Sequence, residues 1–201
     1  MERRNFIKAL MVSGVLGASP LASRAASELF ASGTAQPVMI VSQSGLPQAA
    51  ALVARLTQVL AAAGIEHMQA ALPESEWVTF SHIATLLDRV SGGRVIGVMD
   101  DAAAVIFQEL AAARGATCAV STHHRFADRQ VRHCCTSAGL DASLTWSDSL
   151  ALHTQRMSRL YAGLISGQAL AADQGAQSAG VGWIAPTVGA PDSLVSFLIH
   201  T

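Results

Sequence analysis

RVIGVMDDAAAVIFQELAAARG, residues 94–115, is the stretch that decides the fold. Its first six residues are apolar except for one arginine, which predicts a buried strand over 94–99. Asp100 and Asp101 follow directly, where a carboxylate can accept hydrogen bonds from the first free N–H groups of a helix. An alanine-rich segment then leads to Gly115, a residue type that commonly ends helices. The stretch therefore predicts a strand followed at once by a helix, which is the repeating unit of α/β proteins.

The same unit occurs upstream with short connections. Apolar runs predict strands over 37–42 and 65–72. Helices are expected over 47–63, which opens with a proline, and over 78–90, where apolar residues recur at helical spacing. Strands that alternate with helices in this way form a parallel sheet covered on both faces, and such sheets bind ligands beyond the carboxyl ends of their strands.

The pattern changes downstream of residue 115. Strands are predicted over 116–123 and 131–136, and the seven residues between them are too few for a parallel crossover. These strands should form an antiparallel hairpin with its turn between Ala127 and Asp128, which places Thr122 opposite His133.

A helix over 146–165 and strands over 181–185 and 194–200 complete the expected chain. We therefore expect one α/β domain over 26–201. Its fold would be a mostly parallel three-layer sheet with helices on both faces and antiparallel hairpin additions at 116–136 and 181–200.

The first 25 residues have the layout of a signal peptide, with a basic start, a short apolar run and small residues at its end. Residues 2–8, ERRNFIK, resemble the twin-arginine (Tat) export signal, whose pattern is Ser/Thr-Arg-Arg-x-Phe-Leu-Lys. Glu2 and Ile7 depart from that pattern. The resemblance implies export to the periplasm by the Tat translocase after folding, often with a cofactor or a cofactor-bearing partner. The apolar run is too short and interrupted for a stable membrane span.

Charge excludes several classes of function. Removing Arg3, Arg4, Lys8 and Arg24 from the thirteen basic residues, and Glu2 from the fourteen acidic ones, leaves nine against thirteen. The expected mature chain is thus acidic, which disfavours nucleic acid binding. Because it keeps no lysine, it cannot hold pyridoxal phosphate as a Schiff base. The sequence also contains no Cys-x-x-Cys-His for covalent c-type haem.

Polar side chains that suit a site follow the predicted strands. If the first hairpin strand runs parallel to the others, one rim of the sheet would hold Ser42, Ser44, Asp100, Asp101, His123 and His124. Such groups can bind a small polar ligand, hold a metal, or support nucleophilic hydrolysis. Simpler interpretations are a helix cap at Asp100 or Asp101 and a turn at Ser44. The SQSG stretch there lacks the first glycine of a nucleophile elbow.

The hairpin holds three histidines and two cysteines in HHRFADRQVRHCC, residues 123–135. In the predicted register, His133, Cys135 and Cys118 share one face and are the metal-ligating candidates of this stretch. The spacing matches no structural zinc pattern. Buried inert thiols or one structural disulfide are the alternatives. His153 falls within the apolar stripe of the predicted helix 146–165, and is either a core histidine or a ligand that faces the sheet.

Three functional hypotheses follow. The first is an exported periplasmic protein that binds a small ligand or cofactor and serves as an accessory component of an exported redox system. The second is a metal-dependent or serine-type hydrolase with its site at the strand carboxyl ends. The third is a metal-handling protein that uses the stretch 123–135. The sequence leaves open whether the protein is an enzyme.

Overall fold

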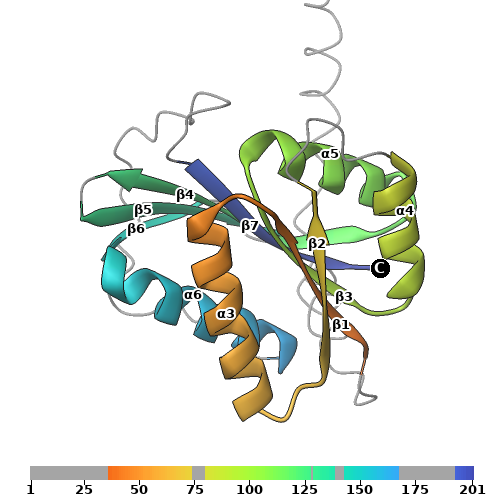
Figure 1. Ribbon diagram of the computed structural model, residues 1–201, viewed down its shortest axis with the longest axis horizontal. Helices are drawn as coiled ribbons and strands as arrows, with labels where there is room; N and C mark the ends of the chain where they lie inside the picture. Colours follow the sequence, from red (N-terminus) through yellow and green to blue (C-terminus); the bar gives the residue numbers. More distant parts are fainter. Residues whose placement is uncertain (1–35, 74–79, 128, 139–142, 168–192) are drawn as a thin grey trace, which may run out of the picture.

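The computed structural model describes residues 36–73, 80–127, 129–138, 143–167 and 193–201 (Figure 1). The elements in chain order are β1 Val38–Gln43, α3 Pro47–Ala62, β2 His67–Leu72, α4 Phe80–Arg89, β3 Arg94–Met99, α5 Asp101–Ala112, β4 Thr117–Ala127, β5 Gln130–Ser137, β6 Leu144–Ser149, α6 Leu150–Ile165 and β7 Ser193–His200. The strand–helix alternation predicted upstream of residue 115 is confirmed.

The described strands form one open sheet in the order β2-β1-β3-β7-β4-β5-β6. β1 is parallel to β2 and β3, whereas β7 lies between β3 and β4 and is antiparallel to both. β4 therefore runs in the direction of β3, as the predicted rim requires. The expected fold class, α/β with antiparallel additions, is confirmed, although the C-terminal strand lies inside the sheet and not at its edge.

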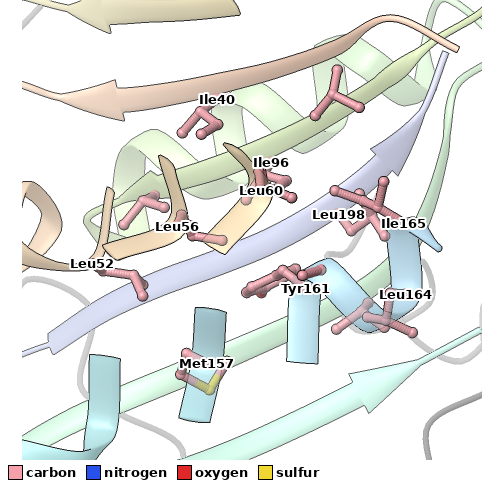
Figure 2. Packing of buried hydrophobic residues seen from close by; sticks show 14 of the residues in the cluster. Ile40, Leu52, Leu56, Leu60, Ile96, Met157, Tyr161, Leu164, Ile165 and Leu198 are labelled. Carbon is pink, nitrogen blue, oxygen red and sulfur yellow. The ribbon is translucent and has the colours of Figure 1, made fainter. Parts of the chain in front are cut away.

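Helices α3 and α6 cover one face of the sheet, and α4 and α5 cover the other (Figure 1). Because successive strand residues point to opposite faces, Val38 and Ile40 pack under α3, while Met39 and Val41 pack under α4. Figure 2 shows the first layer, in which the labelled side chains are Ile40, Leu52, Leu56, Leu60, Ile96, Met157, Tyr161, Leu164, Ile165 and Leu198. Each fully buried side chain of this size stabilises the fold by about 1.5–3 kcal/mol.

Gly97 on β3 leaves room for an aromatic side chain of the neighbouring strand β7. It pairs with Phe197 on β7, and a Cβ atom on Gly97 would lie 2.0 Å from Phe197 Cζ. The Phe197 ring in turn packs on Phe107 of α5, with ring centroids 5.5 Å apart. The far end of the phenylalanine ring thus occupies the space that a Cβ atom on residue 97 would need.

The β4–β5 hairpin is present, but its register differs from the predicted one. Thr122 pairs with Cys135, and His133 pairs with His124. The predicted turn between Ala127 and Asp128 is wrong because β4 extends to Ala127 and β5 begins at Gln130. A shift of two residues leaves each side chain on its predicted face, but it brings two histidines opposite each other.

Two further differences concern the ends of elements. The predicted helix 146–165 begins only at Leu150, because residues 144–149 pair with β5 as strand β6. A register irregularity between Cys118 and Val120 places these two residues on opposite faces of β4.

The expected signal peptide, 1–25, and the expected strand 181–185 lie outside the described residues. No helix in the described part of the chain is long and apolar enough to cross a membrane.

Candidate metal centre

Three histidines from three separate elements meet between the sheet and α6. His124 of β4 and His133 of β5 are direct cross-strand neighbours. His153 lies on the face of α6 that also buries Met157 and Tyr161. The rings are at most 1% exposed, and one nitrogen from each ring lies within 4.8 Å of those from the other two.

The His133 ring is the centre of a stack. The Trp146 ring lies on one side with its centroid 4.8 Å away and its plane tilted by 20°. The His153 ring is 5.1 Å away at an angle of 18°. His124 meets His133 edge-on, and the two Nδ1 atoms are 2.8 Å apart. The position of each ring is therefore fixed by aromatic contacts as well as by its backbone.

Asp148 of β6 lies on the outer side of His133. Its Oδ2 atom is 3.3 Å from His133 Nε2 and accepts a hydrogen bond of 3.0 Å from Trp146 Nε1. Its Oδ1 atom accepts a hydrogen bond of 3.0 Å from Arg156 on α6. Asp148 thus joins the strand that carries Trp146 to the helix that carries His153.

Ser196 of β7 has the corresponding position beside His124. Its Oγ atom is 2.6 Å from His124 Nε2, and it accepts a hydrogen bond of 2.7 Å from the Tyr161 hydroxyl group of α6. The inner nitrogens of His124 and His133 consequently face each other, while their outer nitrogens face Ser196 and Asp148.

Burial keeps all three imidazoles neutral. Burial, followed by the nearby His153, lowers the pKa of His133 to about 3, although the Asp148 carboxylate opposes this shift. Burial lowers the pKa of His153 to about 4. The pKa of His124 also lies well below its ordinary value, first because of burial and then because of the other histidines. At neutral pH the rings are therefore in the unprotonated form that binds metals.

His153 has an unusual environment for a core residue. Neither ring nitrogen has a hydrogen-bond partner, although both are buried. An unsatisfied buried polar group costs about 1–3 kcal/mol, and a metal bound to one nitrogen would remove part of that penalty. Three neutral imidazoles suit zinc, copper, nickel or iron, whereas magnesium and calcium prefer oxygen ligands.

Of the three metal-ligating candidates His133, Cys135 and Cys118, this group contains His133; its other members are His124, expected at the rim, and His153, expected as either a core histidine or a ligand. Cys135 is two residues farther along β5 on the same face, and it is not one of the clustered ligands. Cys118 lies on the opposite side of the sheet, among the residues under α5. All three cysteines are free thiols. Burial raises the pKa of Cys118 to about 11 and also raises that of Cys135, so both thiols are protonated at neutral pH.

The predicted rim is divided between two small polar clusters. Asp100 caps α5 by accepting a hydrogen bond from Ala103 N at 2.7 Å. It also exchanges two hydrogen bonds with Gln43, one from the amide to its carboxylate (2.8 Å) and one from its own N–H (2.9 Å). Gln43 was not singled out from the sequence, although it lies between Ser42 and Ser44.

The second cluster is centred on Asp101. Its Oδ2 atom accepts a hydrogen bond of 2.6 Å from Ser193 Oγ, and its Oδ1 atom is 3.4 Å from His123 Nδ1. Asp101 and His123 are thus brought together as expected. His124, the next residue, faces the opposite side of the sheet.

Ser42 is the last but one residue of β1 and lies on the face opposite Gln43. Ser44 lies in the turn beyond the strand, where its backbone N–H donates to Leu72 O at 2.9 Å. In the described part of the chain, the polar contacts of His123 and His124 are with Asp101, Ser196 and His133, and not with these two serines.

Comparison of the chain with models of protein families, with curated protein sequences and with solved structures gave no match. The fold and the site geometry are therefore the basis for any functional conclusion.

Proposed function

We propose that this is an exported metal-binding protein that carries one divalent transition metal between β4, β5 and α6. The observation that carries the proposal is the convergence of three buried, neutral imidazoles, two of which have a fixed outer partner. Outer partners of this kind orient metal-binding histidines and set which ring nitrogen is presented to the metal. The proposal joins the first sequence hypothesis, a protein that binds a small ligand or cofactor, to the third, a metal-handling protein that uses the stretch 123–135.

The burial of the site favours a metal that is held and not one that turns over substrate. Catalytic zinc sites keep a position open to water or substrate, whereas structural sites are closed by the protein. Here the aromatic rings of Trp146 and Phe126 cover the histidines, with Phe126 edge-on to His153 at 5.4 Å. A closed site is loaded most readily while the chain folds.

The expected Tat signal agrees with this sequence of events. A protein that folds before export acquires its metal from the cytoplasm and not from the periplasm. The accessory role in an exported redox system remains part of the proposal, with the metal as its cofactor and the redox enzyme as its partner.

The Asp101–His123 contact supports a second candidate function, an acid–base hydrolase at the sheet edge. The arrangement differs from that of a serine nucleophile, because Ser193 Oγ donates its hydrogen bond to the carboxylate of Asp101. The metal-binding proposal is favoured because one nitrogen from each of three buried imidazoles lies within 4.8 Å of the other two.

The test is the metal content of protein folded in the cytoplasm and purified without chelator. We expect one equivalent of metal in the wild type and none in the His153→Leu variant. His82→Ala, which removes an exposed histidine of α4, is the matched control and should keep the metal. A wild-type protein with no bound metal, which also takes up no Zn²⁺ or Co²⁺ during refolding, would exclude the proposal.

A further inference from the structure

Five polar side chains form a continuous chain across the site, and each comes from a different element. The order is Tyr161, Ser196, His124, His133 and Asp148. The successive separations are 2.7, 2.6, 2.8 and 3.3 Å. The chain begins at a buried phenol and ends at a carboxylate, with the facing Nδ1 atoms of the two histidines at its middle.

The carboxylate sets the direction of every hydrogen bond in this chain. Asp148 already accepts from Trp146 and Arg156, and an ionised carboxylate can only accept. The ring proton of neutral His133 is therefore favoured on Nε2, although the contact with Asp148 is not aligned as a full hydrogen bond. His133 Nδ1 is then an acceptor.

The remaining donors follow from that assignment. His124 must donate from Nδ1 to His133 Nδ1, because the two atoms are at hydrogen-bond distance and only one can carry a proton. His124 Nε2 then accepts from the Ser196 hydroxyl, which itself accepts from Tyr161. His124 and Ser196 thus each donate once and accept once, and both groups are neutral.

A metal cannot bind between the two histidines in that arrangement. Coordination through both Nδ1 atoms requires a lone pair on each of them. Two nitrogens bound to one tetrahedral zinc ion are also about 3.3 Å apart, given Zn–N bonds of about 2.0–2.1 Å. The observed separation is 2.8 Å. The rings must therefore part slightly, and the proton on His124 Nδ1 must leave.

We propose that metal binding changes the tautomer of His124 and reverses the hydrogen bonds of Ser196 and Tyr161. The inference rests on the proposed metal centre. The proton that leaves Nδ1 of His124 returns to Nε2 of the same ring through solvent water while the rings part, so no proton is lost overall and the ring stays neutral. His124 Nε2 then donates to Ser196 Oγ, and the Ser196 hydroxyl donates to Tyr161.

Thr122 supplies the last acceptor that the reversal needs. It is the cross-strand partner of Ser196, and its buried Oγ1 atom has no aligned hydrogen-bond partner. Burial raises the pKa of Tyr161, and its hydrogen bond with the Ser196 hydroxyl opposes this shift. The reversed Tyr161 hydroxyl donates to Thr122.

The experiment is two-bond ¹H–¹⁵N correlation spectroscopy of ¹⁵N-histidine protein before and after loading with Zn²⁺. We expect His124 to change from the Nδ1–H to the Nε2–H tautomer, while His133 keeps its proton on Nε2 in both states. Zinc bound through Nε2 of His124, or an unchanged His124 tautomer, would overturn the inference and leave the metal centre intact. Absence of zinc uptake would overturn both.

Variants provide a second measurement. Ser196→Ala removes the group that receives the Nε2 proton, so we expect a loss of zinc affinity of about 10–100-fold. Ser158→Ala is the matched control, because Ser158 is also a buried serine but its hydroxyl donates to the carbonyl of Thr154 on its own helix. Equal zinc affinity in the Ser196→Ala variant and the wild type would contradict the role given to Ser196.

Discussion

His124 and His133 lie directly opposite each other on β4 and β5, with their Nδ1 atoms 2.8 Å apart. Cross-strand neighbours on one face of a sheet have their Cβ atoms about 4.5–5.5 Å apart, so two imidazoles in this relation meet at their inner nitrogens without distortion. The sheet thus provides two ligands of fixed geometry, and α6 adds the third. His153 of α6 therefore completes the set of three ligands.

The first prediction concerns His153→Leu. Leucine removes the third ligand and also removes a buried imidazole whose two nitrogens have no hydrogen-bond partner. We expect metal binding to be lost while the free energy of unfolding of the metal-free protein rises by about 1 kcal/mol. Titration with Zn²⁺ and urea denaturation of the same preparation measure the two effects. A destabilised variant would show that His153 has a structural role that the contacts do not reveal.

The second prediction concerns Asp148, which we interpret as a positioning residue for His133. Asp148→Asn keeps one acceptor oxygen but removes the negative charge that orients His133, Trp146 and Arg156. We expect zinc affinity to fall about 10–100-fold, and the absorption bands of the Co²⁺-loaded protein to shift because the coordination geometry changes. Asp88→Asn, at an exposed ion pair with Arg114, is the control and should leave both measurements unchanged.

The third prediction is the effect of acid on the metal-free protein. The folded-state pKa values of His133 and His153 are about 3 and about 4, below the ordinary value of about 6.5. Between the folded-state pKa values and pH 6.5, the unfolded chain binds more protons than the folded one. The contribution of these histidines to the free energy of unfolding is therefore fully present above pH 6.5 and falls as the pH decreases. Within this pH range, each such histidine lowers the free energy of unfolding by about 1.4 kcal/mol for each unit by which the pH decreases.

Urea denaturation at pH 7.5, 6 and 5 measures this dependence before most carboxylates are protonated. The His153→Leu variant should show a smaller decrease, because one of the depressed histidines is absent. Equal stability of the wild type at pH 7.5 and pH 5 would contradict the assignment of neutral, buried imidazoles.

The fold upstream of residue 115 could be predicted because each strand and helix there is bounded by local signals. Proline opens α3, and Asp100 caps α5 by accepting from Ala103 N. Glycines with positive φ follow α3, α4 and α5 at residues 64, 92 and 115. Such signals act within a few residues, so no tertiary contact was needed to recognise them.

The site could be predicted only in part, because it depends on contacts between distant segments. The sequence indicated His133 as a metal ligand, His124 as a rim residue and His153 as either core or ligand, but nothing local joined them. Their meeting depends on a hairpin register that is set by the length of the turn. Asp148 and Ser196 have no functional signal in the sequence, because each acts through a residue on another strand.

The fourth prediction tests the close approach of β3 and β7. Gly97→Ala places a methyl group 2.0 Å from Phe197 Cζ, and overpacking of this kind destabilises a core by about 1–3 kcal/mol. The double variant Gly97→Ala/Phe197→Leu should recover part of that loss, because leucine vacates the space over residue 97. Thermal unfolding of the single and double variants measures the coupling, and strictly additive effects would contradict the contact.

The last prediction separates the histidine site from the cysteines beside it. Cys118 lies across the sheet from the three histidines, and Cys135 lies among the apolar residues under α6. Burial keeps the pKa values of both thiols above their ordinary value, so neither presents a thiolate to a metal at neutral pH. A variant with all three cysteines replaced by alanine should therefore bind metal with the stoichiometry and affinity of the wild type, although the smaller side chains reduce its stability. If the cysteine-free protein folds but loses its metal, the ligands include a thiolate and the three-histidine centre is wrong.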